Sequence, residues 1–176
     1  MKRDTGLRTG RRVSHAFIMD VPTYPKPLII TDAAINIQPT LEDKVDIVQN
    51  AIDLLRALGI EQPKVAILSA VETVSPKIPS TIEAAALCKM AQRGQITGGL
   101  LEGPLALDNA ISEEAARIKG IDSPVAGHAG QQPGQAVAGR VDDHAEQDRP
   151  GQRAHVHPGL GDAGGRGRCR RVQPHD

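Results

Sequence analysis

The sequence predicts an α/β protein with a largely parallel sheet, followed by a segment that has no fold-forming pattern. Over residues 1–126, short β-like runs alternate with amphipathic stretches of about 9–18 residues, which is typical of βαβ units. From residue 127 onward the large aliphatic residues almost vanish. We therefore divide the chain into an α/β domain over 1–126 and a tail over 127–176.

The first elements are two short strands and a long helix. The runs "SHAFIMDV" (14–21) and "PLIITDAAINI" (27–37) have β-like composition. A helix is predicted over 39–59, because apolar residues recur there at helical spacing. Thr40 suits its N-cap, Glu42 and Asp43 suit its first turn, and Gly59 suits its end.

The remaining elements continue the alternation. "KVAILS" (64–69) is an apolar run of strand length, as in a buried parallel strand. A second helix is predicted over 79–94 with Ser80 or Thr81 as its cap, then a strand within "QITGGLLEG" (95–103). A third helix follows over 112–120, with Ser112 as its cap and Gly120 as its end.

Composition restricts the partners that we expect. The 21 basic and 21 acidic residues balance, so no strong field steers the molecule toward nucleic acid or a membrane. No apolar run approaches the roughly 20 residues of a membrane span, and the basic N-terminus leads into no signal-peptide segment. The two cysteines form no spaced set, which favours a reducing, cytoplasmic location.

The tail is predicted to be disordered or loosely coiled. It contains five of the six His, ten of the 18 Gly and a single Leu, with no Lys, Ile, Phe, Tyr or Met. Such a segment buries too little apolar surface to offset a backbone ordering cost of about 1–2 kcal/mol per residue. Its His155-x-His157 pair and Cys169 match no zinc framework. Its "GRGRCRR" run lacks interleaved aromatic residues, so we expect no nucleic-acid partner and keep RNA contact as an alternative.

Candidate site residues follow the predicted strands or precede the first, where parallel sheets place their ligands. Arginine geometry suits phosphate oxygens, although a solvated basic N-terminus is the ordinary alternative. Hydroxyl, amide and carboxylate groups at strand ends can contact a polar ligand, although turn and cap hydrogen bonds explain them equally well. The candidates are Arg8, Arg11, Arg12 and Ser14; Asp32 and Asn36; Ser69, Glu72 and Thr73; and Glu102, Gly103, Pro104 and Asp108.

Five stretches in order carry a resemblance to a known family. They are "GLRTGRRVSHAFIMD", "LIITDAAINIQPTLEDKVDIVQNAIDLLRALG", "PKVAILSAVETVSPKIPST", "GQITGGLLEGPLALDNAIS" and "EAARIKGIDSPVAG". Over roughly residues 6–127 the chain resembles the phosphate acetyl/butyryl transferase family, in particular the phosphate acetyltransferase part of longer, bifunctional enoyl-CoA hydratase/phosphate acetyltransferase proteins. The resemblance implies part of an isocitrate/isopropylmalate dehydrogenase-like fold, with two α/β domains around a cleft, and a homo-oligomeric parent.

The resemblance also implies the chemistry. An acyl group passes reversibly between coenzyme A, which is a substrate, and inorganic phosphate, with acetyl phosphate as one product and with no metal or other cofactor. An Asp removes the thiol proton, and polar groups hold the phosphate and the developing oxyanion. The candidates above are then substrate-binding residues rather than catalytic ones, and Cys88 in "AAALCKM" is a core residue.

One departure from the family pattern bears on activity. The family places a Ser-Arg pair and its catalytic Asp in the last third, in a pattern like "TSRxDS", whereas this chain has no Ser after Ser123. We therefore expect a family fragment that begins inside the domain and is inactive alone. A non-catalytic, unstable product is the alternative. For the inactive fragment and for the unstable product alike, we expect unpaired sheet edges that favour aggregation or dimer-like pairing.

A frameshift near Gly127 explains the change of character. One permitted codon set for Gln131–Val137, with GG before it and regrouped by one nucleotide, spells Gly-Asn-Ser-Leu-Ala-Lys-Gln, which is similar to the family's "AGNxLAKQL". We predict that a one-base shift in the coding nucleotides restores an aliphatic α/β pattern after codon 127. Sequencing that region is the test, and the hypothesis fails if no shifted frame restores the pattern.

Overall fold

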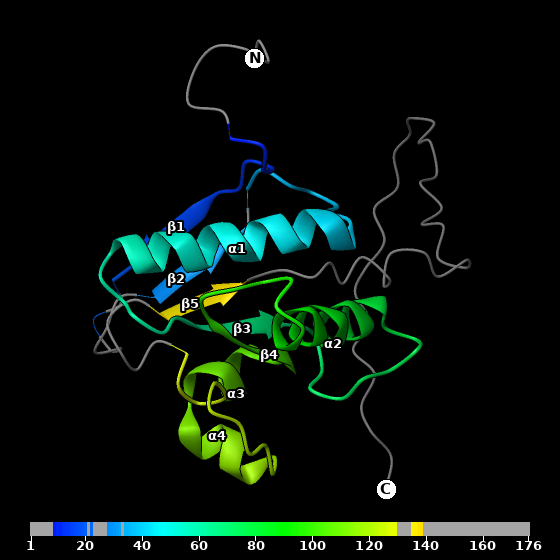
Figure 1. The fold of residues 1–176 in the computed structure, drawn as a ribbon. Coiled ribbons are helices and arrows are strands. Elements are labelled where there is room, and N and C mark those ends of the chain that lie inside the picture. The colour runs from blue at the N-terminus through cyan, green and yellow to red at the C-terminus, as the bar shows by residue number, and fades with distance from the viewer. Residues whose placement is uncertain (1–8, 21, 23–27, 33, 130–134, 139–176) are drawn as a thin grey trace, which may run out of the picture.

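The computed structural model describes residues 9–20, 22, 28–32, 34–129 and 135–138, and the last four by their backbone alone. Four parallel strands and one antiparallel strand form a sheet in the order β1-β2-β5-β3-β4 (Figure 1). They are β1 (Ala16–Met19), β2 (Leu28–Thr31), β3 (Lys64–Leu68), β4 (Leu100–Leu105) and β5 (Gln135–Ala138). The α/β class and the largely parallel sheet are therefore confirmed, and β1 is the exception because it runs antiparallel to β2.

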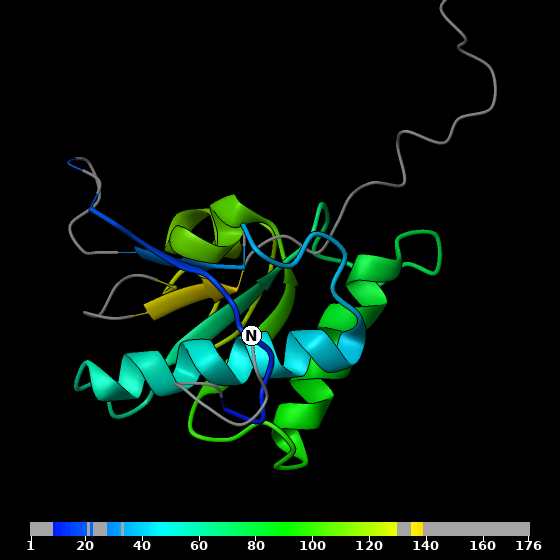
Figure 2. The same ribbon diagram turned by 90° about the horizontal axis from the view of Figure 1, so that it is seen from above.

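Helices cover both faces of the sheet. They are α1 (Leu41–Ala57), α2 (Pro79–Gln92), α3 (Leu107–Ile111) and α4 (Glu113–Ile118). Figure 2 shows α1 and α2 on one face and the short α3–α4 pair on the other. Alternate β3 residues serve the two faces: Val65 and Ile67 pack in the α1–α2 core, and Ala66 packs in the α3–α4 core.

The ends of α1 confirm the sequence analysis. The Thr40 side chain accepts a hydrogen bond from the Asp43 N–H at 3.2 Å, and the Asp43 carboxylate accepts one from the Thr40 N–H at 2.9 Å. This capping box satisfies two backbone donors that a helix start leaves unpaired. Gly59 has φ +91°, a conformation that ends the helix at low steric cost.

The start of α2 differs from the prediction. Its N-cap is Ile78, and Pro79 occupies the first turn, where the missing proline N–H costs no hydrogen bond. Ser80 and Thr81 lie inside the helix and are buried. The Thr81 hydroxyl accepts from the Ser75 N–H at 2.9 Å, so it holds the preceding loop instead of capping the helix.

A second difference concerns the segment after α2. The sequence pattern predicted a strand there with other bounds, and it did not predict the α3 helix. The predicted strand lay within 95–103, whereas β4 begins at Leu100 and continues through Pro104 to Leu105. A Cβ on Gly103 would stand 2.7 Å from the Ile67 Cβ, so only glycine lets β4 approach β3 this closely. Pro104 is tolerated because β4 is an edge strand.

The tail contributes more structure than predicted. Gly127 to Ala129 are ordered and mostly buried, and the Gly127 N–H donates to the Asn109 carbonyl at 2.7 Å. Gln135–Ala138 form the central strand β5, parallel to β2 and to β3. For these segments the predicted disorder is wrong, because backbone hydrogen bonds to two strands do not require large side chains. The His155, His157, Cys169 and "GRGRCRR" predictions lie outside the described residues.

We predict that a Val137→Pro substitution destabilises the fold. Proline removes one N–H of the central strand, and its ring disturbs the adjacent backbone, at a cost of about 3 kcal/mol or more. Val137→Ala is the matched control, since it trims the same side chain and keeps the N–H. Urea unfolding followed by circular dichroism should give a lower midpoint for the proline variant than for the alanine variant. Equal midpoints would show that β5 does not hold the sheet together.

Candidate functional site

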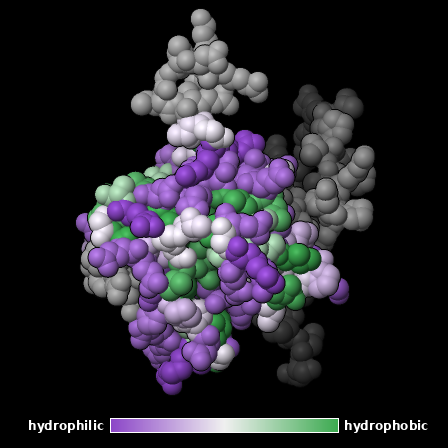
Figure 3. Space-filling model, in the orientation of Figure 1, coloured by the Kyte–Doolittle hydropathy of each residue, from purple (hydrophilic) through white to green (hydrophobic). Residues whose placement is uncertain are grey.

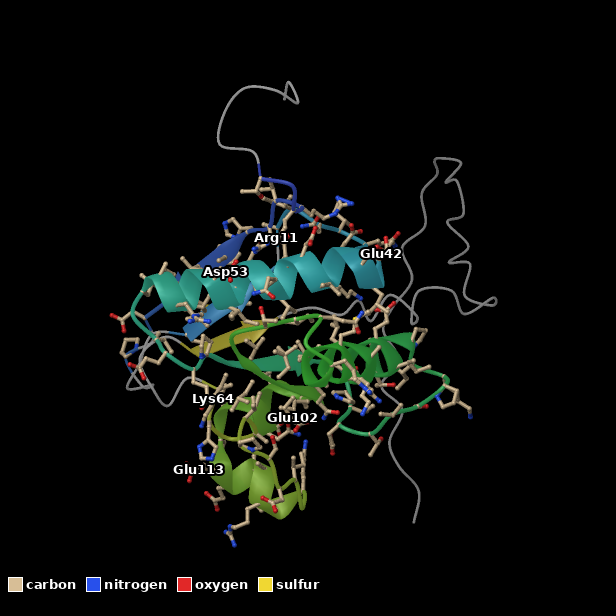
Figure 4. The ribbon with its side chains drawn as sticks, viewed as in Figure 1. Arg11, Glu42, Asp53, Lys64, Glu102 and Glu113 are labelled. Atoms are coloured by element: carbon tan, nitrogen blue, oxygen red, sulfur yellow. The ribbon has the colours of Figure 1, made fainter. Side chains whose placement is uncertain are left out.

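The polar groups that precede β1 pack onto α1. Arg11 Nη1 contacts Asp53 Oδ2 at 2.6 Å, and Arg12 Nε contacts Asp43 Oδ1 at 2.5 Å. Figure 4 shows Arg11 and Asp53 on the same side of α1. Hydrogen bonding to Arg12 holds the pKa of Asp43 below its usual range. Both guanidinium groups are thus engaged with helix carboxylates, and Arg8 lies outside the described residues.

Asn50 joins this segment to a small cavity. Its Nδ2 donates to the Arg12 carbonyl at 2.8 Å and to Ser14 Oγ at 3.0 Å. A cavity of about 230 Å³ lies between the segment, Thr31 and α1, with Arg12, Ser14 and Asn50 in its wall. Two predicted residues therefore share one cavity, and Asn50 is a neighbour that the sequence pattern did not reveal.

Asp32 and Asn36 form a closed turn after β2. Asp32 Oδ1 accepts the N–H groups of Ala34 and Ile35, both at 3.0 Å, and Oδ2 accepts the Asn36 N–H at 3.1 Å. The Asn36 side-chain amide donates to Asp32 and, at 3.1 Å, to the Val13 carbonyl. Both amide donors of Asn36 are therefore occupied, and the turn is tied to the segment before β1.

Opposing effects act on Asp32, which is only 6% exposed. Burial raises the pKa of its carboxyl group, but the donors of Ala34, Ile35 and Asn36 outweigh burial and hold the pKa below its ordinary value. Asp32 is consequently an anion fixed in place by its own turn.

Ser69, which follows β3, contacts α2 and the end of β4. Ser69 Oγ and Ser80 Oγ are 2.8 Å apart, and the Ser69 N–H donates to the Leu105 carbonyl at 2.9 Å. Thr73 is exposed in the loop between β3 and α2. Glu102 Oε1 accepts the N–H of its neighbour Gly103 at 3.1 Å, and Figure 4 places Glu102 on β4 beside α3.

Lys119 links two of the predicted carboxylates. Its Nζ lies 3.2 Å from Asp108 Oδ2 and 3.5 Å from Glu72 Oε2. The hydrogen bond with Asp108 raises the pKa of Lys119, and the same bond lowers the pKa of Asp108. Lys119 was not predicted as a site residue. Its position in the sequence, next to the predicted helix end at Gly120, could have indicated a cation at this place.

Cys88 has the character of a core residue. Burial, aided by the charge of Glu102, raises the pKa of its thiol to about 12, so the thiol stays protonated at neutral pH. Its Sγ lies 3.7 Å from the Gly103 carbonyl. Within the described residues, no group of three or more His, Cys, Asp or Glu side chains is placed to hold a metal ion.

The two sets of candidates are separated by β5. Arg12, Ser14, Asp32 and Asn36 lie on the β2 side, and Ser69, Asp108 and Glu72 lie on the β3–β4 side. Carboxyl ends of parallel strands meet at one edge of the sheet, and β5 lies between the two sets in the strand order.

The comparisons with known proteins decide the family. Residues 5–130 match the family model described as "Phosphate acetyl/butaryl transferase". The chain belongs to the phosphate acetyl/butyryl transferase family. The match ends where the composition of the sequence changes.

Individual relatives agree with this assignment. The chain is 77% identical over 125 residues to a phosphate acetyltransferase of Rhizobium meliloti, covering 71% of this chain and 40% of the relative. It is 49% identical over 129 residues to a phosphate butyryltransferase of Clostridium acetobutylicum, covering 73% and 43%. The chain therefore spans about two fifths of these relatives' length.

Solved structures support the fold. A phosphotransacetylase from Streptococcus pyogenes has a TM-score of 0.57 at 29% identity, covering 72% of this chain and 37% of that one. A branched-chain phosphotransacylase from Enterococcus faecalis has a TM-score of 0.55 at 35% identity, covering 64% and 38%. In the part of the chain that the structure describes, no helix is long and apolar enough to cross a membrane.

We predict that Asp32→Asn lowers stability by about 1–3 kcal/mol at pH 7, because one amide N–H₂ then faces the donors of Ala34 and Ile35 or of Asn36. The folded pKa of Asp32 is depressed, so its stabilising effect is present above the unfolded pKa of about 3.9 and is lost as the pH falls through the folded value. The difference between wild type and variant should shrink over that acidic range.

Urea unfolding at several pH values measures this difference. Asp20→Asn is the control, since Asp20 is exposed and has no hydrogen bond or ion pair among the described residues. A stability loss for Asp32→Asn no larger than that of the control would contradict the role assigned to the turn.

Proposed function

We propose that the α/β unit is part of the substrate cleft of a phosphate acyltransferase, and that this chain does not transfer acyl groups by itself. The reaction assigned to the parent enzyme moves an acyl group between coenzyme A and inorganic phosphate, as the names of the relatives suggest. The parent fold is proposed to have two α/β domains around a cleft, with a homo-oligomeric assembly in the cytoplasm.

One observation carries the proposal of inactivity. The family match ends at residue 130, before β5, the central strand of the sheet. In a parallel sheet the carboxyl edge is where the reacting groups meet. This chain has no Ser after Ser123, so it lacks the Ser-Arg pair and the catalytic Asp that the family resemblance implies, and no group is left to remove the thiol proton.

The state of the remaining candidates supports the same conclusion. Arg11 and Arg12 already contact carboxylates of α1, and the Asn36 donors are occupied. Around Lys119 two carboxylates surround one ammonium group, which leaves a net negative charge where a phosphate would have to bind. These residues are proposed to line and shape the cleft, and exchange of partners would be needed before they bind a phosphate.

The test is acyl transfer by the purified full-length chain. Acetyl phosphate and coenzyme A are mixed with the chain, and acetyl-CoA is followed by its thioester absorbance. We expect no formation above the protein-free background, because the thiol is not deprotonated by any residue of this chain. The phosphate acetyltransferase of Rhizobium meliloti is the positive control, and turnover by the chain above background would overturn the proposal.

A binding titration separates the two forms of the proposal. Saturable but weak binding of coenzyme A in calorimetry, without turnover, supports a retained part of the cleft. Absence of both binding and turnover supports the alternative of a non-catalytic translation product. Competition by inorganic phosphate would show whether the retained part includes the phosphate position.

A further inference from the structure

A second cavity lies on the α3–α4 face of the sheet. It has a volume of about 460 Å³, and small-molecule sites in proteins occupy roughly 300–1,000 Å³. Its wall runs along α4 and the loop that follows Gly120, and its described residues include none of the candidate substrate-binding residues. Figure 4 shows Glu113, which belongs to this wall, on α4, with the sheet between it and Arg11. This cavity is therefore distinct from the candidate acyl-transfer groups.

The loop that closes the cavity is fixed by its backbone. Gly127 passes the start of α4 so closely that a Cβ there would stand 2.5 Å from the Glu113 Cα, and its φ of +75° also favours glycine. Ser123 Oγ accepts the N–H groups of Val125 and Ala126 at 3.1 and 3.3 Å. The shape of the cavity is thus set by the fold, as in most small-molecule sites.

The floor of the cavity is apolar and consists of Ala116, Ile121 and Ala126. The two alanines are each 4% exposed, and Ile121 is half-buried. The Ile121 N–H donates to the Ala116 carbonyl at 2.9 Å, which holds the loop against the end of α4. An apolar group of a ligand that rests on this floor leaves water, which favours binding.

Two charges of opposite sign in the wall are unpaired in the described part of the chain. The side chains of Arg117, on α4, and Asp122, in the loop, make no hydrogen bond or ion pair there. Glu113 differs, because His128 Nδ1 lies 3.1 Å from its Oε1. Figure 3 shows mainly hydrophilic side chains at the lower end of the molecule, where Figure 1 places α4.

The two unpaired charges restrict the chemistry of a ligand. A ligand with a single charge is attracted by one of them and repelled by the other. A ligand that carries one charge of each sign can pair with both. The apolar floor further selects a ligand with an apolar group beside its charges.

We propose that this cavity binds a zwitterionic α-amino acid with an apolar side chain. The carboxylate pairs with the Arg117 guanidinium, whose planar fork can donate two parallel N–H bonds to it. The ammonium group pairs with Asp122, and the side chain rests on the apolar floor. The inference concerns a site outside the acyl-transfer groups and stands whether or not the proposed acyltransferase function holds.

Three ligands that differ in charge test the proposal. L-leucine carries both charges, N-acetyl-L-leucine lacks the ammonium group, and L-leucinamide lacks the carboxylate. Calorimetric titration of the purified full-length chain is done at about pH 6.5, below the α-amino pKa of about 8. We expect the dissociation constant of L-leucine to be about tenfold lower than that of either blocked ligand, because each blocked ligand loses one charge-assisted contact.

Two variants assign the two ends of the ligand. Arg117→Gln should raise the dissociation constant of L-leucine about tenfold and leave that of L-leucinamide unchanged, since the amide has no carboxylate to lose. Asp122→Asn should weaken L-leucine to a similar extent and leave N-acetyl-L-leucine unchanged. Arg93→Gln is the matched control, because Arg93 is exposed at the end of α2 and lies outside the cavity wall.

Thermal melts followed by circular dichroism establish that each variant is folded. No measurable binding of L-leucine to the wild type would overturn the proposal, as would equal affinity for the three ligands. A loss of affinity in Arg117→Gln and Asp122→Asn no larger than in Arg93→Gln would also overturn it.

Discussion

The sheet depends on backbone pairing of its central strand. In the sheet order β2 and β3 are not neighbours, and β5 joins the β1–β2 pair to the β3–β4 pair. An isolated pair of strands is marginal in water, whereas three or more with a packed face can be stable. The α1–α2 core needs that junction, since Ile29 from β2 and Val65 from β3 pack in one cluster with Ile52 of α1. The family-derived elements are thus assembled around a segment that lies outside the family match.

How far the sequence predicted this fold depends on whether the governing interaction is local. The α1 helix was predicted closely because its cap, its apolar stripe and Gly59 are all encoded within one segment. The β5 strand was missed because pairing on both sides is a tertiary effect, and "QAVA" carries no strong periodic signal. The continuation of β4 through Pro104 was missed for a similar reason. Gly103 is needed for the close contact of β4 with Ile67 on β3, and no local pattern reveals that contact.

The grouping of the candidate residues was partly predictable, and their partners were not. Among the residues predicted near strand ends, Asp32 contacts Asn36, and Asp108 and Glu72 share the cation Lys119. The sequence could not indicate that Arg11 contacts Asp53 and Arg12 contacts Asp43. Those carboxylates lie on α1, far along the chain, and come close to the arginines only in the fold. Lys119 was missed because its two carboxylate partners come from separate parts of the chain, Asp108 from α3 and Glu72 from the loop after β3.

These contacts bear on how the charged candidate groups are stabilised within this chain. A charged group that lacks its substrate or its companion residue costs free energy unless another group compensates for it. In this chain compensation comes from within: helix carboxylates hold the arginines, and the turn donors hold Asp32.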